Sequence, residues 1–315
     1  MSQEIIEKTF NVDTPAKLTL SNIRGSVKIL PGEDNTVKVT ALKHQKSGDS
    51  ERTEITLTQM GANHISVKTK YPDDWFGFPT RKPCEVEYTV EVPKECSLKV
   101  SGVSNSTAIQ GVEGEMDIKS VSGQMSLKDI SGPLKINSVS GKVYGERLTG
   151  SLEFKTVSGK IHLDESHFPC IEGQTVSGNI SLHTPILNGP YQFKSVSGNV
   201  ELFIPANTAC TAVIKSLSGR IKTPLSTTSS HINAGNSRLE IHGGGVEVRS
   251  KSVSGSLVLK PYKESHIDGI NKPASLEPQV HSVSTDTISP AEGHMELLER
   301  IANGELSVDE ALEKI

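Results

Sequence analysis

The sequence predicts an all-β fold: a β-solenoid of the parallel β-helix type with rungs of roughly 18–21 residues, followed by a short carboxyl-terminal helical hairpin. A tetrapeptide of the form SVSG recurs between Ser120 and Gly255. Apolar and polar residues alternate around each copy, which is the period of a strand with one buried face. Only 34% of the 315 residues are hydrophobic and 4% are aromatic, too few for the wide core of a compact domain of this length.

Charge and hydropathy exclude several classes of protein. The net charge of −4 and the isoelectric point near 6.2 argue against a nucleic-acid partner. No apolar stretch reaches the ~18 residues of a transmembrane helix. The first residues, MSQEIIEKTFNV, lack the basic start and apolar centre of a secretory signal, so we expect a cytoplasmic protein, with the inner face of the membrane as its alternative location. The four cysteines lack C-x-x-C spacing and indicate buried thiols.

Residues 1–100 are expected to open the solenoid. Leu18, Leu20, Val27 and Ile29 stand at the same offsets from Gly25 as the apolar residues around the later glycines. Four further segments alternate in the same way: VKVTALKH, EITLTQM, HISVKTK and CEVEYTVEVP. We therefore expect strands with less regular turns in this region.

Residues 101–261 contain the repeat itself. The positions two and four residues after each glycine, and five before it, are mostly aliphatic or aromatic, with Gly145 and Gly173 as exceptions. Like positions of successive rungs should stack about 4.8 Å apart and build a narrow core. The valine two residues before each glycine is expected to face this core, and the glycines to supply turn conformations that β-branched residues refuse.

The repeat ends before a polar, aperiodic linker, residues 262–289. Residues 290–315 then predict two short helices: Ser289 and Pro290 start the first, and Gly304 ends it. Helices this short bury little surface alone, so we expect them to dock on the solenoid end, on a second copy or on another protein. The residues expected to dock are Leu298, Ile301, Leu306 and Leu312.

Tandem VSG units after the segment VEYTVEVPKECSLKV resemble the bacterial toastrack family of β-strand-repeat proteins, whose older name refers to adhesins. The resemblance covers roughly residues 1–262. The segment MELLERIANGELSVDEALEKI is similar to bihelical modules that accompany toastrack domains in bacterial envelope-stress proteins, where the module commonly lies at the amino-terminal end. The resemblance implies a role at the bacterial envelope, in stress sensing.

The hydroxyl residues that flank each repeat valine are predicted to form a surface ladder. Such hydroxyls most often satisfy turn backbone, and a regular polar surface for a glycan is the functional alternative. The ladder comprises Ser120, Ser122, Ser138, Ser140, Thr156, Ser158, Thr175, Ser177, Ser195 and Ser197.

Four aromatic residues, Tyr71, Trp75, Phe76 and Phe78, gather within eight residues beside two basic ones. One interpretation is a plug that shields unpaired strand edges at a solenoid end. The other is contact with a partner protein or a membrane interface.

A candidate for a metal site or for catalysis lies on one outward face. Stacking should place Glu146, Asp164 and His183 on successive rungs, with His162 beside Asp164. A solvated face is the more common meaning of such residues. No nucleophile elbow, zinc-protease motif or phosphate-binding loop occurs, so no cofactor is expected.

We therefore expect a non-enzymatic interaction scaffold that binds a protein partner, with a membrane-associated partner as one alternative. Self-association into a homo-oligomer through a solenoid end or the helical tail is a second expected contact. The alternatives are an exported cell-surface adhesin and a carbohydrate-active enzyme of the β-helix type.

Overall fold

The computed structural model describes residues 3–71, 82–233 and 235–262. They form β-strands and one short 3-10 helix, Gln45–Ser47, so the all-β prediction is confirmed for the described part of the chain. No helix among these residues is long and apolar enough to span a bilayer. The expected linker, residues 262–289, lies outside the described residues except for Tyr262, which ends the last described strand. The expected helical hairpin, with Leu298, Ile301, Leu306 and Leu312, also lies outside the described residues.

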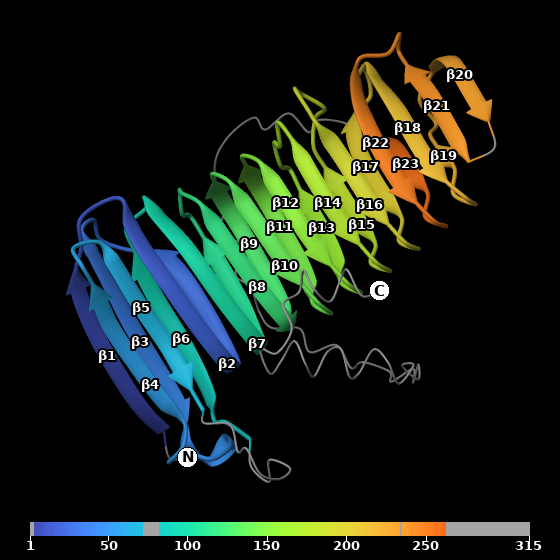
Figure 1. Ribbon diagram of the computed structural model, residues 1–315. Coiled ribbons are helices and arrows are strands. Elements are labelled where there is room, and N and C mark those ends of the chain that lie inside the picture. The colour runs from blue at the N-terminus through green and yellow to red at the C-terminus, as the bar shows by residue number, and fades with distance from the viewer. Residues whose placement is uncertain (1–2, 72–81, 234, 263–315) are drawn as a thin grey trace. The chain divides into compact units, whose positions relative to one another are not determined.

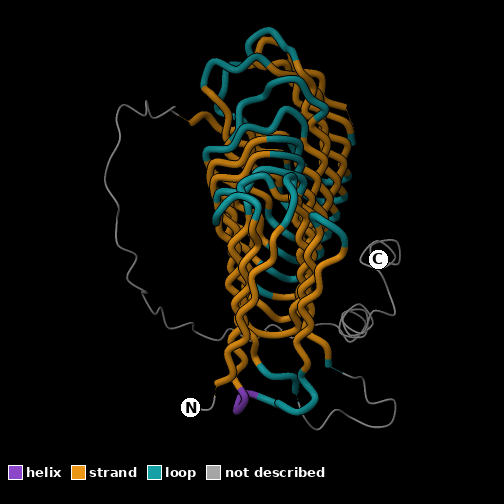
Figure 2. The backbone as a smooth tube through the Cα atoms, turned by 90° about the vertical axis from the view of Figure 1, so that its left-hand side faces the viewer, coloured by secondary structure: helices purple, strands orange, loops and turns teal. Residues whose placement is uncertain are grey.

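Each rung of the repeat contributes one strand to each of two parallel sheets, which we call the first and the second sheet (Figures 1 and 2). The first sheet contains β8 (Met116–Ser122), β10 (Leu134–Ser138), β12 (Leu152–Thr156), β14 (Ile171–Thr175) and β16 (Tyr191–Ser195). The second sheet contains β9 (Gln124–Ser131), β11 (Lys142–Thr149), β13 (Lys160–Asp164), β15 (Ile180–His183) and β17 (Val200–Pro205). The β7 strand (Cys96–Gln110) and the β2 strand (Ala16–Pro31) are long enough to pair in both sheets.

The rungs stack in register, so each core residue lies on its counterpart in the next rung. Ile118, Ile136 and Phe154, for example, are direct neighbours in the first sheet and are fully buried. The two exceptions in the sequence pattern have a packing reason. The ring of Phe154 occupies the space that a side chain on Gly173 would need, and Leu148 and Leu163 fill the corresponding space at Gly145.

The repeat glycines are required for a different reason from the one expected. Gly141 and Gly159 do not have positive φ angles, but a Cβ atom on Gly159 would lie 2.5 Å from the carbonyl oxygen of Gly141. Each of these corners therefore packs directly on the backbone of the corner below it. The opposite corners, at Gly114, Gly132 and Gly150, combine this close approach with a positive φ angle, and so does Gly123, the first glycine of the repeat.

The last rung is out of sequence order. Strands β22 (Val246–Ser252) and β23 (Leu257–Tyr262) pair with β16 and β17, and β18 (Cys210–Ser216) and β19 (Ile221–Lys222) pair with their other edges. The chain thus leaves a gap after β17 and later fills it. The expectation that each rung stacks on the next one in sequence is wrong at this end.

Antiparallel strands form both ends of the described stack. At the amino-terminal end, β5 (His64–Lys70) and β6 (Glu85–Val92) still pair in parallel with β2, and the strands beyond them pair antiparallel. The outer strands there are β4 (Glu54–Met60), β3 (Thr36–His44) and β1 (Gln3–Asn11). At the other end β21 (Asn236–Ile241) pairs with β18, and β20 (Thr227–Asn233) is outermost.

The four cysteines are free thiols, and burial raises the pKa of Cys96 to about 12 and that of Cys210 to about 11.

Candidate functional site

A row of five rings crosses the outer face of the second sheet. Residues that alternate with the core residues of a strand point away from the core, and on five adjacent strands such positions carry an aromatic or imidazole ring. The members of this ring row are Tyr144 of β11, His162 of β13, His183 of β15, Phe203 of β17 and Tyr262 of β23.

The rings of the row lie within contact range of one another, with Tyr262 contacting His183 two strands away. The ring centroids of Tyr144 and His162 are 6.5 Å apart, and those of His162 and His183 are 5.8 Å apart, both in edge-to-face arrangements. His183 lies 4.1 Å from Phe203 and 6.1 Å from Tyr262, with the latter pair nearly parallel at 18°. Such separations are typical of favourable ring pairs. Since Tyr144 is 41% exposed, the row presents ring surface to solvent.

Charged groups border the ring row. The Lys260 ammonium lies 5.2 Å from the centre of the Phe203 ring and 3.1 Å from a Glu201 carboxylate oxygen. The ammonium lies over the ring in a cation–π arrangement and provides a hydrogen-bond donor, and the carboxylate provides an acceptor.

Asp164 connects the two histidines of the row. One carboxylate oxygen lies 2.7 Å from His183 Nδ1 and the other 3.7 Å from His162 Nε2. Burial lowers the pKa of His183 below 6.5, and the His162 ring adds to that effect, while Asp164 opposes it. His183 is therefore mainly neutral at pH 7 and can accept or donate a hydrogen bond.

Glu146 takes no part in this cluster. It is in register with Asp164, as expected, but its carboxylate contacts the Arg147 guanidinium and lies 3.5 Å from Lys128 Nζ. Arg147 also lies 2.6 Å from Asp129 and lowers the pKa of that carboxyl. Among the described residues, no three histidine, cysteine or acidic side chains are arranged to hold a metal ion.

A hollow lies beside each end of the ring row. One has a volume of about 260 Å³, and its lining includes Tyr144, His162 and Asp164. The other has a volume of about 610 Å³, and its lining includes Phe203, Lys260 and Pro261. Both are open to solvent, so the face suits a ligand that lies along the surface rather than one enclosed in a pocket.

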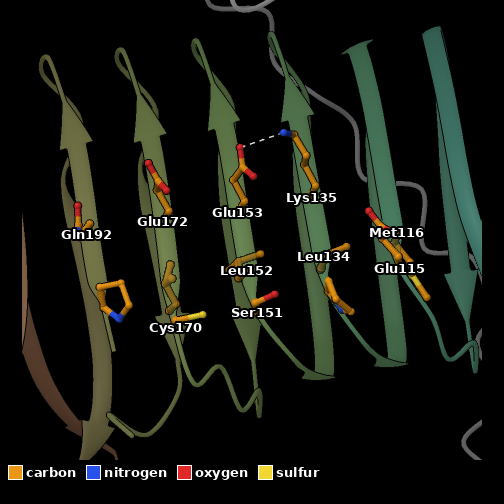
Figure 3. A pocket seen from close by; sticks show the side chains of 13 residues that line it. Glu115, Met116, Leu134, Lys135, Ser151, Leu152, Glu153, Cys170, Glu172 and Gln192 are labelled. Atoms are coloured by element: carbon orange, nitrogen blue, oxygen red, sulfur yellow. Dashed lines mark ion pairs between the residues drawn. The ribbon is translucent and has the colours of Figure 1, made fainter. Parts of the chain in front are cut away.

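The outer face of the first sheet has a different character. A groove of about 430 Å³ runs over β8 to β16, and Glu115, Glu153, Glu172 and Gln192 lie along it (Figure 3). The Lys135 ammonium pairs with Glu153 across 3.1 Å. This groove offers charged groups, and none of the residues that line it is aromatic.

Half of the predicted hydroxyl ladder is not on the surface. These residues are buried, because their strand positions point inward and their hydroxyls close the corner: the backbone N–H of Gly159, for example, donates to Thr156 Oγ1 at 3.0 Å. The prediction of surface hydroxyls is therefore wrong for Ser120, Ser138, Thr156, Thr175 and Ser195.

The other half of the ladder lies at the surface or partly buried at the corner. Most of these hydroxyls donate to the valine carbonyl one rung away, as Ser140 does to Val121 at 3.3 Å. They are Ser122, Ser140, Ser158, Ser177 and Ser197. The valine between the two hydroxyls was expected to face the core. Val139 and Val157 are buried, but Val196 and Leu217 are largely exposed.

Only one residue of the predicted aromatic cluster can be placed. Tyr71 is half-buried, and the Arg52 guanidinium lies 5.5 Å from its ring centre. Trp75, Phe76 and Phe78 lie outside the described residues.

The sequence analysis missed Tyr144, Phe203, Tyr262 and Lys260. The glycine alignment that placed Glu146, Asp164 and His183 in one column also places Phe203 and Lys260 there, five residues after Gly198 and Gly255. Tyr144 lies two residues before Glu146 on the same face. These positions are visible in the sequence, but as aromatic and lysine residues they do not belong to the histidine and acidic residues expected of a metal or catalytic site.

The family model described as Toastrack DUF4097 matches residues 16–260. No curated protein is similar to the chain. A “putative adhesin” from Bacteroides fragilis is 12% identical over 83% of this chain and 98% of its own, with a TM-score of 0.47. A “putative adhesin” from Parabacteroides distasonis is 10% identical over 82% and 97%, with a TM-score of 0.42. A “putative cell adhesion protein” from Clostridium sporogenes is 11% identical over 82% and 100%, with a TM-score of 0.27.

These comparisons correct one expectation and confirm another. The expected cytoplasmic location, including the inner face of the membrane, is contradicted by the names of the similar structures, two called “putative adhesin” and one called “putative cell adhesion protein”. That expectation depended on the first residues alone, and these do not decide where a protein is delivered. The resemblance of the repeat is confirmed, since the family model covers most of the chain: the chain belongs to the toastrack family.

Proposed function

We propose that the chain is a non-enzymatic adhesion scaffold that binds an extended carbohydrate along the ring row. The observation that carries the proposal is the continuity of Tyr144, His162, His183, Phe203 and Tyr262 across five adjacent strands. The apolar C–H faces of sugars pack on exposed rings, and hydroxyl groups at their edges bind charged and imidazole groups. The names of the similar structures support an adhesion role.

The geometry of the face also favours a long ligand over a small one. The hollows are shallow and open, whereas small-molecule sites are concave and enclose most of their ligand. Five strands spaced about 4.8 Å apart give the row a length of about 19 Å. A polymer of repeating units matches a surface built from repeating rungs.

A carbohydrate-active enzyme is the less supported alternative. Glycoside hydrolysis uses two carboxyl groups that flank the scissile bond. On this face the Asp164 carboxylate is bound to His183, and Glu146 is bound to basic side chains. The triple variant Glu146→Gln, Asp164→Asn, His183→Gln should therefore leave any glycan turnover in the preparation unchanged.

Binding to a panel of immobilised oligosaccharides tests the proposal. The Tyr144→Ala and Phe203→Ala variants should each bind at least about tenfold more weakly, because each removes an anchoring ring. Gln192→Ala, an exposed change on the first sheet, is the matched control and should bind like the unchanged protein. Loss of binding in the control, or none in the ring variants, would overturn the assignment.

A role at the cell envelope, including a link to envelope stress, is a further part of the proposal and comes from the similarity of residues 295–315 to bihelical modules of envelope-stress proteins. A protein partner recognised through that segment would be released when residues 291–315 are deleted. Glycan binding by the ring row should survive that deletion.

A further inference from the structure

Three stacked rungs share a five-residue pattern at the repeat corner, a lysine followed by serine, an aliphatic residue, serine and glycine. They are the segments 194–198, 251–255 and 215–219, in their spatial order along the first sheet. In each segment the first serine is turned inward, so the lysine before it and the aliphatic residue after it lie on the same outer side. We call this surface the corner strip.

The aliphatic members of the corner strip are exposed. The exposed fractions are 44% for Val196, 48% for Val253 and 84% for Leu217. The equivalent residues of earlier rungs, Val139 and Val157, are 1% and 9% exposed. The remaining equivalents, Val121 and Val176, are partly buried, so the three adjacent exposed residues stand out within the repeat. Adjacent exposed aliphatic residues indicate a surface that contacts a partner.

The lysines of the corner strip are stacked without neutralising partners. Lys194 is directly opposite Lys251, and Lys251 is directly opposite Lys215. None of the three has an acidic group within 4.0 Å among the described residues. Arg220 follows directly, and the three segments contain no acid. Like charges opposite one another on neighbouring strands destabilise a sheet, so an anionic partner would relieve a cost that the free protein bears.

We propose that the corner strip binds an anionic lipid surface. A basic row beside exposed aliphatic side chains fits the boundary between acidic headgroups and acyl chains, where lysines attract the headgroups and aliphatic residues enter the apolar layer. A soluble polyanion would satisfy the lysines but would leave Leu217 and Val253 exposed. The strip lies on the first sheet and its corner, so this contact is separate from glycan binding by the ring row.

Co-sedimentation of the full chain with vesicles tests the proposal. Vesicles of phosphatidylcholine and phosphatidylglycerol in equal parts should bind the protein, and vesicles of phosphatidylcholine alone should not. The double variant Lys194→Gln, Lys251→Gln should bind about 25-fold more weakly, from about fivefold for each basic residue near the surface. The double variant Lys142→Gln, Lys160→Gln removes two exposed lysines that are also opposite one another, on the second sheet, and should bind like the unchanged protein.

The aliphatic residues separate a lipid surface from a soluble polyanion. The variant Leu217→Ser, Val253→Ser should lose vesicle binding at raised salt but should keep its binding to dextran sulfate. Equal binding to both vesicle types, an equal loss in the control lysine pair, or unchanged vesicle binding by the serine variant would each overturn the proposal. Circular dichroism checks that each variant is folded, and oligosaccharide binding on the same samples keeps this test independent of the ring row.

Discussion

At the scale of single residues, the volume available to a core side chain depends on the residue stacked on it in the next rung. Phe154 and Phe193 are both fully buried, and their ring centroids are 6.5 Å apart across the rung that contains Gly173. The absence of a side chain on Gly173 is therefore part of the core. A large side chain in one rung is balanced by a small residue at the same position of the next rung, rather than by a neighbour in its own strand.

A double-mutant cycle tests this compensation. Gly173→Ala should lower the free energy of unfolding by about 1–3 kcal/mol, because the new methyl group overpacks against Phe154. Phe154→Leu alone should also destabilise, because it leaves a cavity. The combined variant should be more stable than the sum of the two effects by at least about 0.5 kcal/mol in urea unfolding. Strict additivity would contradict the shared space.

The titration of His183 tests the electrostatics of the ring row. Its pKa is below 6.5, so the unfolded chain takes up the proton at higher pH than the folded one, and stability should fall as the pH drops below 6.5 and level off below the folded pKa. By ring NMR, Asp164→Asn should lower the pKa further, while His162→Gln should raise it. Shifts of the same sign in both variants would contradict the assigned causes.

At the scale of strands, neighbours in space are not always neighbours in sequence. Strands β22 and β23 lie between β16 and β17 on one side and β18 and β19 on the other, although β18 and β19 come earlier in the sequence. The corners of these last rungs, SVSG, SLSG and SVSG, are nearly identical, so their tetrapeptides do not distinguish this order from a consecutive one. Gly255 packs on Gly198, and Gly219 packs on Gly255.

Engineered disulfides test this strand order. In a Cys170→Ser background, cysteines introduced at Lys194 and Lys251 should form a disulfide on mild oxidation, since directly paired strands lie about 4.8 Å apart. Cysteines at Lys194 and Lys215 should not, because one strand separates them. Disulfide formation is read by mass spectrometry after digestion. A disulfide in the second pair and none in the first would instead indicate that the rungs stack in sequence order.

The period, the alternation and the strands of residues 33–100 could be predicted because each depends on local patterns of apolar residues. The inward hydroxyls, such as Thr156, follow from the same alternation, since Thr156 lies two residues after the buried Phe154, but the expectation that the neighbouring valine faces the core assigned them to the surface. The ring row was not predicted, for a different reason. Tyr144 and Phe203 become neighbours of the histidines only through stacking, which the sequence shows solely when every outward column is read.

At the scale of the whole molecule, the described stack changes from parallel to antiparallel pairing at both ends. The last strand, β20, is exposed along its length, and Ile232 there is 71% exposed. Exposed edges invite pairing with other chains. A parallel stack with such an edge needs protection from self-association.

Deletion of residues 291–315 tests whether the tail supplies protection or contact. If the tail caps an end, the shortened chain should form larger species in light scattering. If it mediates a defined oligomer, the shortened chain should become a monomer. An unchanged mass would contradict both roles expected from the apolar residues of this segment.

The central claim, that a long ligand lies along the ring row, is tested most directly by calorimetric titration with oligosaccharides of increasing length from one binding polysaccharide. The affinity should rise with length until the ligand covers about 19 Å, the span of five strands, and then level off. Phe203→Ala should end this rise at a shorter length, because it interrupts the row. An affinity independent of length, and equal in the variant, would contradict the claim.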